Sequence, residues 1–190
     1  MKVGLYFGSF NPIHIGHLAI ANFMVEFTDI DQVWFVVSPH NPFKNKSSLL
    51  NGYDRLAMVE RAIEDDNRFR ASNIEFGLPQ PSYTIDTLVY LEEKFPDHNF
   101  SLIMGSDNLK SINKWKNSEV LLERYPIYVY PRPDFDPSDW ADNPKIHITE
   151  SPQFDISATF IRKGIAEGKN ICHFLPPKVW DLIDNSGYYK

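Results

Sequence analysis

The stretch VGLYFGSFNPIHIGH, residues 3–17, joins an apolar strand pattern to the start of a helical pattern. Residues 3–7 predict a buried strand, and Gly8 allows the backbone to approach a ligand closely. Pro12 then favours a tight turn before a helix predicted from about residue 15 to residue 27. A helix start that follows a strand and a turn of small residues presents free amides to an anion. The sequence therefore predicts a phosphate site at this turn.

Two histidines, His14 and His17, stand one helical turn apart at this predicted helix start. An imidazole, with an ordinary pKa of about 6.5, can donate a hydrogen bond to a phosphoryl oxygen or add positive charge beside it. The alternatives are two polar residues without a ligand, or a zinc site. Zinc usually needs a third protein ligand, often cysteine, and the chain has only Cys172. The turn, the glycines and the helix start together favour phosphate.

Size and composition indicate a single domain spanning residues 1–190, because 190 residues with 43% hydrophobic composition can bury a substantial core. The formal net charge of −6 argues against a nucleic-acid-binding protein, which would need a basic face. No apolar run has the length of a membrane span, and no secretory signal pattern is visible. We therefore expect a cytoplasmic protein that binds neither nucleic acid nor membranes. The proline-rich segment 131–145 is predicted to be a surface loop.

Apolar runs rich in β-branched residues alternate with helical patterns along the chain. The predicted strands are residues 3–7, 33–37, 100–104 and 127–130, with weaker candidates at 70–76 and 146–149. Helical patterns follow Asp54 and Thr84, and their apolar faces are formed by Leu56, Val59 and Ile63 and by Leu88, Leu91 and Phe95. This alternation predicts an α/β fold with a mainly parallel sheet flanked by helices.

Three distinctive loops follow predicted strands. GSFNPIHIGH (residues 8–17) follows the first, SPHNPFK (38–44) the second, and GSDNL (105–109) the strand at 100–104. Open parallel sheets bind ligands beyond the carboxyl ends of their strands. We therefore expect these loops to form one cleft.

A second candidate anion site lies late in the chain, in DISATFIRKG (residues 155–164). Ser157 is a plausible N-cap, and the amides that follow it can face an anion. Arg162, about one turn further on, suits a bidentate contact with phosphate. Taken alone, the segment is more typical of an ordinary capped helix with a solvated arginine.

Together, HIGH (residues 14–17) and ISATFIR (156–162) resemble the HxGH and ISSTxxR motifs of a nucleotidyltransferase superfamily. SYTIDTL (82–88), GSDNL (105–109) and Trp115 resemble the bacterial nicotinate mononucleotide adenylyltransferases within it, over nearly the whole chain. The chain departs from the commoner family pattern at four positions, which are Phe7, Asn11, Phe43 and Ala158.

The resemblance implies a Rossmann-like fold and the transfer of AMP from ATP to nicotinate mononucleotide, giving deamido-NAD and pyrophosphate. It assigns the catalytic role to four residues, which are His14, His17, Lys44 and Arg162. The ATP-binding residues that it implies are Gly8, Ser9, Phe10, His14, Gly16, His17, Lys44, Ser157, Thr159 and Arg162. It also implies Mg²⁺ bound with ATP and few direct protein ligands to it, so no metal-binding residue is assigned.

Three residues are implied to bind the nicotinate nucleotide. Thr84, at a predicted helix start, would place amides near the nicotinate carboxylate. Trp115 could stack on the pyridine ring, although core packing is an equal alternative without the resemblance. Asp107 could accept a hydrogen bond from a ribose hydroxyl or cap the next helix.

Two other functions remain as alternatives. A phosphopantetheine adenylyltransferase shares the outer motifs and uses another acceptor, but SYTIDTL and Trp115 favour nicotinate. A nucleotide sensor without turnover would need fewer of the phosphate-facing residues. The sequence is compatible with a homo-oligomer.

Replacing His17 with alanine is expected to lower turnover much more than it weakens ATP binding, because the proposed role of His17 is to stabilise the transition state. Steady-state kinetics and equilibrium ATP binding measure the two effects. An unchanged turnover would contradict the catalytic role and favour the sensor.

Overall fold

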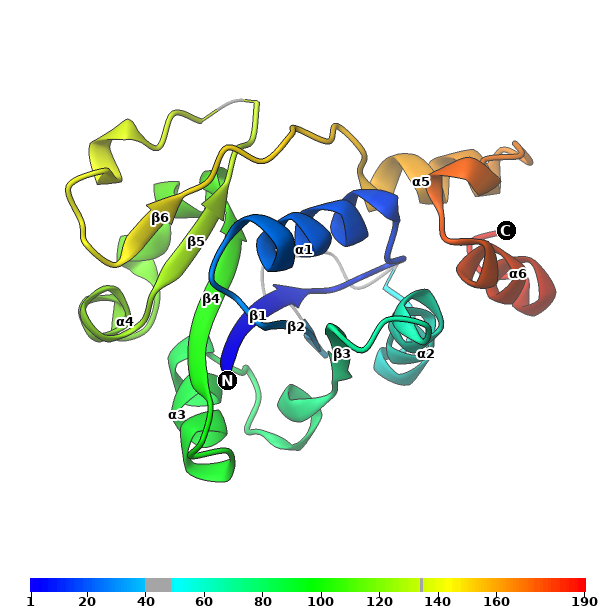
Figure 1. The fold of residues 1–190 in the computed structure, drawn as a ribbon. Helices are drawn as coiled ribbons and strands as arrows, with labels where there is room; N and C mark the ends of the chain where they lie inside the picture. The colour runs from blue at the N-terminus through cyan, green and yellow to red at the C-terminus, as the bar shows by residue number, and fades with distance from the viewer. Residues whose placement is uncertain (40–48, 134) are drawn as a thin grey trace.

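The computed structural model describes residues 1–39, 49–133 and 135–190. In these residues the chain forms a sheet of six strands, in the order β3-β2-β1-β4-β5-β6 (Figure 1). The strands are β1 (Lys2–Gly8), β2 (Gln32–Val37), β3 (Phe69–Ser72), β4 (Asn99–Gly105), β5 (Ile127–Tyr130) and β6 (Ile146–Ile148). Every neighbouring pair is parallel. The predicted Rossmann-like α/β fold is confirmed.

The winding of the sheet reverses at its centre. The chain adds β2 and β3 on one side of β1, then crosses to β4 on the other side and continues outward to β5 and β6. The register pairs Gly8 with Val37 and Tyr6 with Ile103, so the carboxyl ends of the central strands lie close to one another. Such a reversal opens a crevice at this edge of the sheet, where ligands bind in open α/β folds.

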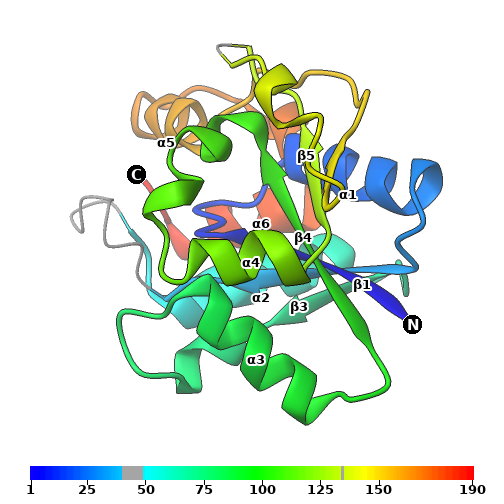
Figure 2. The same ribbon diagram turned by 90° about the vertical axis from the view of Figure 1, so that its left-hand side faces the viewer.

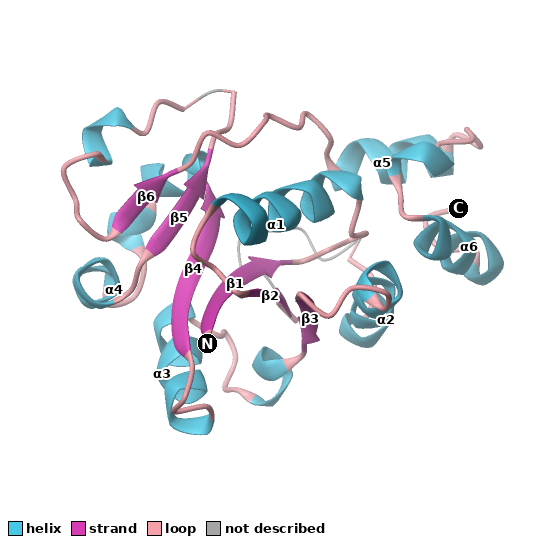
Figure 3. Ribbon diagram, viewed as in Figure 1, coloured by secondary structure: helices cyan, strands magenta, loops and turns pink. Residues whose placement is uncertain are grey.

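Helices cover both faces of the sheet (Figures 2 and 3). They are α1 (Ile15–Phe27), α2 (Gly52–Ile63), α3 (Thr84–Lys94), α4 (Ser118–Arg124), α5 (Ala158–Ala166) and α6 (Pro177–Ser186). Helices α1, α2, α5 and α6 pack in one core with Tyr6, whereas α3 and α4 pack in a second core with Leu5. Successive strand residues point to opposite faces of the sheet, so Leu5 and Tyr6, which are neighbours in β1, belong to different cores. None of the helices in the described residues is long and apolar enough to span a membrane.

The structure corrects several predicted boundaries. The strand predicted at residues 70–76 ends at Ser72, because the chain turns into a short 3₁₀ helix, Ile74–Gly77. The amide of Phe76 donates to the carbonyl of Asn73 in this turn, 2.9 Å away, instead of to a neighbouring strand. The last strand ends at Ile148 and not at Thr149. Segment 131–145, predicted as a loop, contains a short 3₁₀ helix, Ser138–Trp140.

The helix predicted after Asp54 begins two residues earlier, at Gly52. Its N-cap is Asn51, whose side-chain oxygen accepts a hydrogen bond from the amide of Tyr53 at 2.8 Å. Val59 and Ile63 are buried as predicted, and Leu56 packs partly buried beside them. The N-cap Ser157 is confirmed, because its hydroxyl accepts from the amide of Phe160 at 3.2 Å.

Arg55 of α2 ties together the loops at the carboxyl ends of β1 and β2. Its side chain is completely buried, and its guanidinium donates hydrogen bonds to four backbone carbonyls. The acceptors are Leu50 at 2.9 Å, Ser9 at 2.5 Å, Ser38 at 2.8 Å and Pro39 at 3.0 Å. A planar guanidinium can satisfy several carbonyls at once, which a single ammonium group cannot do in the same geometry. Arg55 therefore holds the two loops at a fixed distance from each other.

Replacing Arg55 with methionine is expected to lower the free energy of unfolding by about 2–4 kcal/mol, because it leaves buried carbonyl groups without donors. Urea unfolding followed by circular dichroism measures this loss. The matched control is Arg61→Met on the same helix, where the arginine is exposed and pairs with Glu64 at 3.4 Å. The control should change stability by no more than about 0.5 kcal/mol. Equal effects of the two substitutions would contradict the structural role of Arg55.

Candidate active site

The histidine pair lies where α1 begins, beyond the carboxyl end of β1. His14 is the N-cap of α1, and its ring stacks on that of His17 with 3.7 Å between centroids. The amide of His14 donates to Nδ1 of His17 at 3.2 Å. When His17 is neutral, this bond fixes its proton on Nε2, which makes Nε2 a hydrogen-bond donor. The pair is thus an ordered unit held by the backbone.

Aromatic and glycine residues pack around the two imidazoles and hold them in place. The ring of Phe10 packs edge-on against His17, with centroids 5.1 Å apart, and is itself buried in the core. A side chain at Gly8 would come within 2.7 Å of that Phe10 ring, so glycine is needed there. A side chain at Gly16 would lie 3.2 Å from the His14 ring. The predicted residues Gly8, Phe10 and Gly16 therefore shape the site through packing around the histidines.

His14 is held in its neutral form. Its side chain is only 5% exposed, and its Nδ1 is buried without a hydrogen-bond partner in the described part of the chain. Burial and, to a smaller extent, the positive charge of Arg132 together lower the pKa of His14 to about 4. At neutral pH this histidine therefore acts through hydrogen bonding and not through charge.

Arg132 is a site residue that its sequence context alone does not distinguish from a solvated loop arginine. It lies just beyond the carboxyl end of β5, at the same edge of the sheet as the other site loops. Its amide donates a hydrogen bond to the hydroxyl of Ser106 at 2.9 Å. Its guanidinium reaches the hydroxyl of Tyr130 at 3.4 Å, and its charge acts on His14. Asp107 lies close enough to help raise the pKa of Arg132. The position directly after a predicted strand was the only signal for this residue in the sequence.

Arg162 joins α5 to the loop that carries the histidines. One of its η nitrogens donates to the backbone carbonyl of Asn11 at 2.8 Å, and the other donates to the hydroxyl of Thr159 at 3.3 Å. Arg162 is therefore anchored in the turn, which excludes the alternative of a solvated arginine. Phe154, three residues before Ser157, lies beside Gly16, so the segment that leads into α5 runs close to the histidine turn.

A cavity of about 480 Å³ adjoins these loops on the other face of the sheet. Thr84, the first residue of α3, lines it together with Trp115, Asn108 and Phe7. A smaller neighbouring cavity of about 80 Å³ shares these four residues. The structure thus brings Thr84 and Trp115 together as predicted. Asp107 is not among the lining residues, and its neighbour Asn108 takes that place.

A buried carboxylic acid, Glu75, forms part of the cavity wall and was missed in the sequence. It accepts a hydrogen bond from the hydroxyl of Thr87 at 3.1 Å. Burial is the largest influence on Glu75 and raises its pKa above the usual range. Only the short 3₁₀ turn brings Glu75 inward, so no periodic pattern could have indicated it.

Lys44, predicted to bind phosphate, and the departure at Phe43 lie outside the described residues. The loop predicted at residues 38–44 is described only as far as Pro39. The carbonyls of Ser38 and Pro39 accept hydrogen bonds from Arg55, which also binds the carbonyl of Ser9 in the β1 loop.

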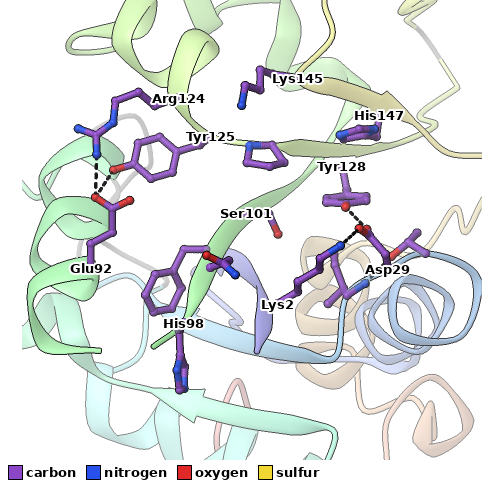
Figure 4. A pocket seen from close by; sticks show the side chains of 15 residues that line it. Lys2, Asp29, Glu92, His98, Ser101, Arg124, Tyr125, Tyr128, Lys145 and His147 are labelled. Atoms are coloured by element: carbon purple, nitrogen blue, oxygen red, sulfur yellow. Dashed lines mark hydrogen bonds and ion pairs between the residues drawn. The ribbon is translucent and has the colours of Figure 1, made fainter. Parts of the chain in front are cut away.

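Another groove, of about 620 Å³, lies at the opposite, amino-terminal end of β1, β4 and β5 (Figure 4). Two clusters of paired side chains line this groove. Glu92 accepts from Arg124 at 3.1 Å and from the hydroxyl of Tyr125 at 2.9 Å. Asp29 accepts from Lys2 and from the hydroxyl of Tyr128. The candidate active site is therefore the crevice at the carboxyl ends of the strands. The groove differs from it because its acidic side chains are paired with basic side chains and tyrosine hydroxyls of the groove itself.

Comparisons with known proteins agree with this geometry. Residues 5–164 match the cytidylyltransferase-like family. A protein of Flavobacterium johnsoniae described as a probable nicotinate-nucleotide adenylyltransferase is 58% identical over 192 residues, with 100% of both chains covered. A Bacteroides fragilis protein with the same description is 50% identical, with 96% of this chain and 90% of the relative covered.

Among solved structures, the nicotinic acid mononucleotide adenylyltransferase of Plasmodium falciparum complexed with NaAD has a similar fold. The TM-score is 0.82 at 21% sequence identity, with 99% of this chain and 97% of that chain covered. At this identity the similarity establishes the shared fold.

The pKa of His14 can be measured by nuclear magnetic resonance, and we expect a value of about 4 that rises in Arg132→Met, because the nearby positive charge is removed. In the unfolded chain His14 has an ordinary pKa of about 6.5. Between pH 6.5 and 4 the unfolded state therefore binds a proton that the native state does not. Stability should accordingly fall by about 2–3 kcal/mol over this range, and less in His14→Asn. A native pKa near 6.5 would contradict the burial of His14.

Proposed function

The chain belongs to the nicotinate-nucleotide adenylyltransferase family, and we propose that the crevice at the carboxyl ends of its strands carries out the reaction of that family. The enzyme transfers AMP from ATP to nicotinate mononucleotide in NAD biosynthesis. A phosphate oxygen of the acceptor attacks the α-phosphorus of ATP. The bond between the α-phosphorus and the oxygen that links it to the β-phosphorus breaks, and pyrophosphate leaves. The acceptor brings its own nucleophile, so the protein has only to align two anions and stabilise developing charge.

The observation that carries this proposal is the meeting of four nitrogen-bearing side chains from three separate segments. His14 and His17 come from the start of α1, Arg132 follows β5, and Arg162 lies in α5. In our proposal the imidazoles of His14 and His17 donate hydrogen bonds to phosphate oxygens, and the guanidiniums balance the negative charge of those oxygens. The amides that follow His14 and Ser157 add two helix N-termini. Gly8, Ser9, Phe10, Gly16 and Thr159 complete the ATP site.

The acceptor occupies the neighbouring cavity in this proposal. The amides at the start of α3, beside Thr84, bind the nicotinate carboxylate, and Trp115 stacks on the pyridine ring. The cavity shares Gly8 and Ser9 with the ATP side, so in this proposal the two substrates meet at the carboxyl end of β1. Asp107, next to Arg132, faces the ribose or orients that arginine.

Mg²⁺ is proposed to enter with ATP. In residues 1–39, 49–133 and 135–190 no three His, Cys, Asp or Glu side chains gather to hold a metal ion. The groups near the histidine pair are imidazoles and guanidiniums, whereas Mg²⁺ prefers oxygen ligands. The residues present therefore fit a metal bound through the triphosphate and water, where it would neutralise phosphate charge. Lys44, a cytoplasmic location and a homo-oligomeric state remain predictions.

The identity of the acceptor tests this function directly. Pyrophosphate release should be at least about tenfold faster, as kcat/KM, with nicotinate mononucleotide than with nicotinamide mononucleotide, because helix-start amides interact more strongly with a carboxylate than with a neutral amide. Phosphopantetheine should be inactive as an acceptor. His17→Ala serves as the catalytically impaired control. Equal use of the two mononucleotides would overturn the nicotinate assignment, and a preference for phosphopantetheine would assign the other transferase.

A further inference from the structure

The last residues of the chain return to the histidine loop. Helix α6 ends at Gly187, which has a φ of 67°, and the amide of Tyr188 donates to the carbonyl of Ile183 at 3.1 Å. Tyr189 follows with a φ of 66°, a conformation that is unfavourable for a residue with a side chain. Contacts of the side chain must hold it there. The main one is a hydrogen bond from its hydroxyl to the side-chain oxygen of Asn11, at 2.7 Å.

Asn11 is the point at which four segments meet. Its side-chain oxygen also accepts from the amide of Leu50, but at 3.3 Å, so the Tyr189 hydroxyl is the closer donor. Its backbone carbonyl accepts from Arg162 at 2.8 Å. Asn11 is buried and precedes His14 by only three residues. A shift of Asn11 would therefore move the anchor of Arg162 and the turn that carries the histidines.

The surroundings of Tyr189 agree with this role. Burial is the largest influence on the hydroxyl and raises its pKa well above the usual range, while the nearby charges of Arg162 and Arg55 oppose this shift. The hydroxyl therefore stays protonated and able to donate throughout the physiological pH range. Arg55, the residue that ties the β1 and β2 loops, and Arg162 both lie close enough to this hydroxyl to act on it electrostatically.

We propose that Tyr189 is a positioning residue for the triphosphate: through Asn11 it fixes the orientation of Arg162 and of the histidine loop, although it does not touch the substrate. The proposal deepens the proposed function and rests on its assignment of the ATP side of the crevice. The acceptor cavity, formed by α3 and the segment around Trp115, is independent of this contact.

The test is Tyr189→Phe, which removes the hydroxyl and keeps the ring. The dissociation constant of a non-hydrolysable ATP analogue, measured by calorimetry, and the KM for ATP should each rise about fivefold, as expected for the loss of one buried hydrogen bond. The KM for nicotinate mononucleotide should stay within about twofold of the wild type, since the acceptor cavity lies elsewhere. Deleting residues 189 and 190 should weaken ATP binding at least as much.

Tyr188→Phe is the matched control, because its hydroxyl interacts with Asp54 and not with Asn11. It should leave the affinity for the ATP analogue unchanged. Unchanged affinity in Tyr189→Phe, or equal losses in both variants at a temperature where both are folded, would overturn the positioning role. A wild-type protein that binds the analogue but forms no dinucleotide would refute the proposed function instead, and leave the positioning role to be judged by the binding data.

Discussion

The buried guanidinium of Arg55 is the constraint on which the crevice depends. Backbone carbonyls in irregular loops cannot pair with one another as they do in a sheet, and a buried carbonyl without a donor is costly. A single side chain of α2 satisfies carbonyls of the β1 loop, the β2 loop and the segment before α2. The loops can therefore remain irregular and still be rigid. The relative positions of the β1 and β2 loops at the ligand-binding edge of the sheet therefore depend on Arg55.

An anionic substrate must be attracted to a protein whose own net charge is −6. The structure provides this attraction locally. Arg132, which follows β5, and Arg162, in α5, come from two separate segments, and both are held by neutral hydrogen-bond acceptors, Tyr130 and Asn11. In those contacts neither guanidinium is paired with a carboxylate. The positive charge of each guanidinium therefore remains available to a phosphate. The neutral His14, on which the charge of Arg132 acts, avoids the repulsion that a third cation would add before the substrate binds.

Much of the fold could be predicted because strand runs and helix periodicity are local properties. The strand at residues 127–130 and the helix at 15–27 were predicted to the residue. The histidine pair was predicted from a motif at a strand end, the Ser157 cap from a helix-start pattern, and the pairing of Thr84 with Trp115 from the family resemblance. Arg55, Glu75 and Tyr189 were not foreseen. Their roles depend on partners brought near by tertiary folding, as far as 178 positions away for Tyr189, and no spacing pattern encodes such contacts.

The two cores of the molecule divide its substrates between them. The groups assigned to the triphosphate stand on α1 and α5, which pack on one face of the sheet, whereas the groups assigned to the acceptor lie on α3 and beside α4, which pack on the other. In the proposed assignment, β1 and its loop serve both. Substitutions in the second core can therefore reshape the acceptor cavity without repacking the nucleotide side. This separation makes acceptor choice the property of the architecture that evolution can alter most independently.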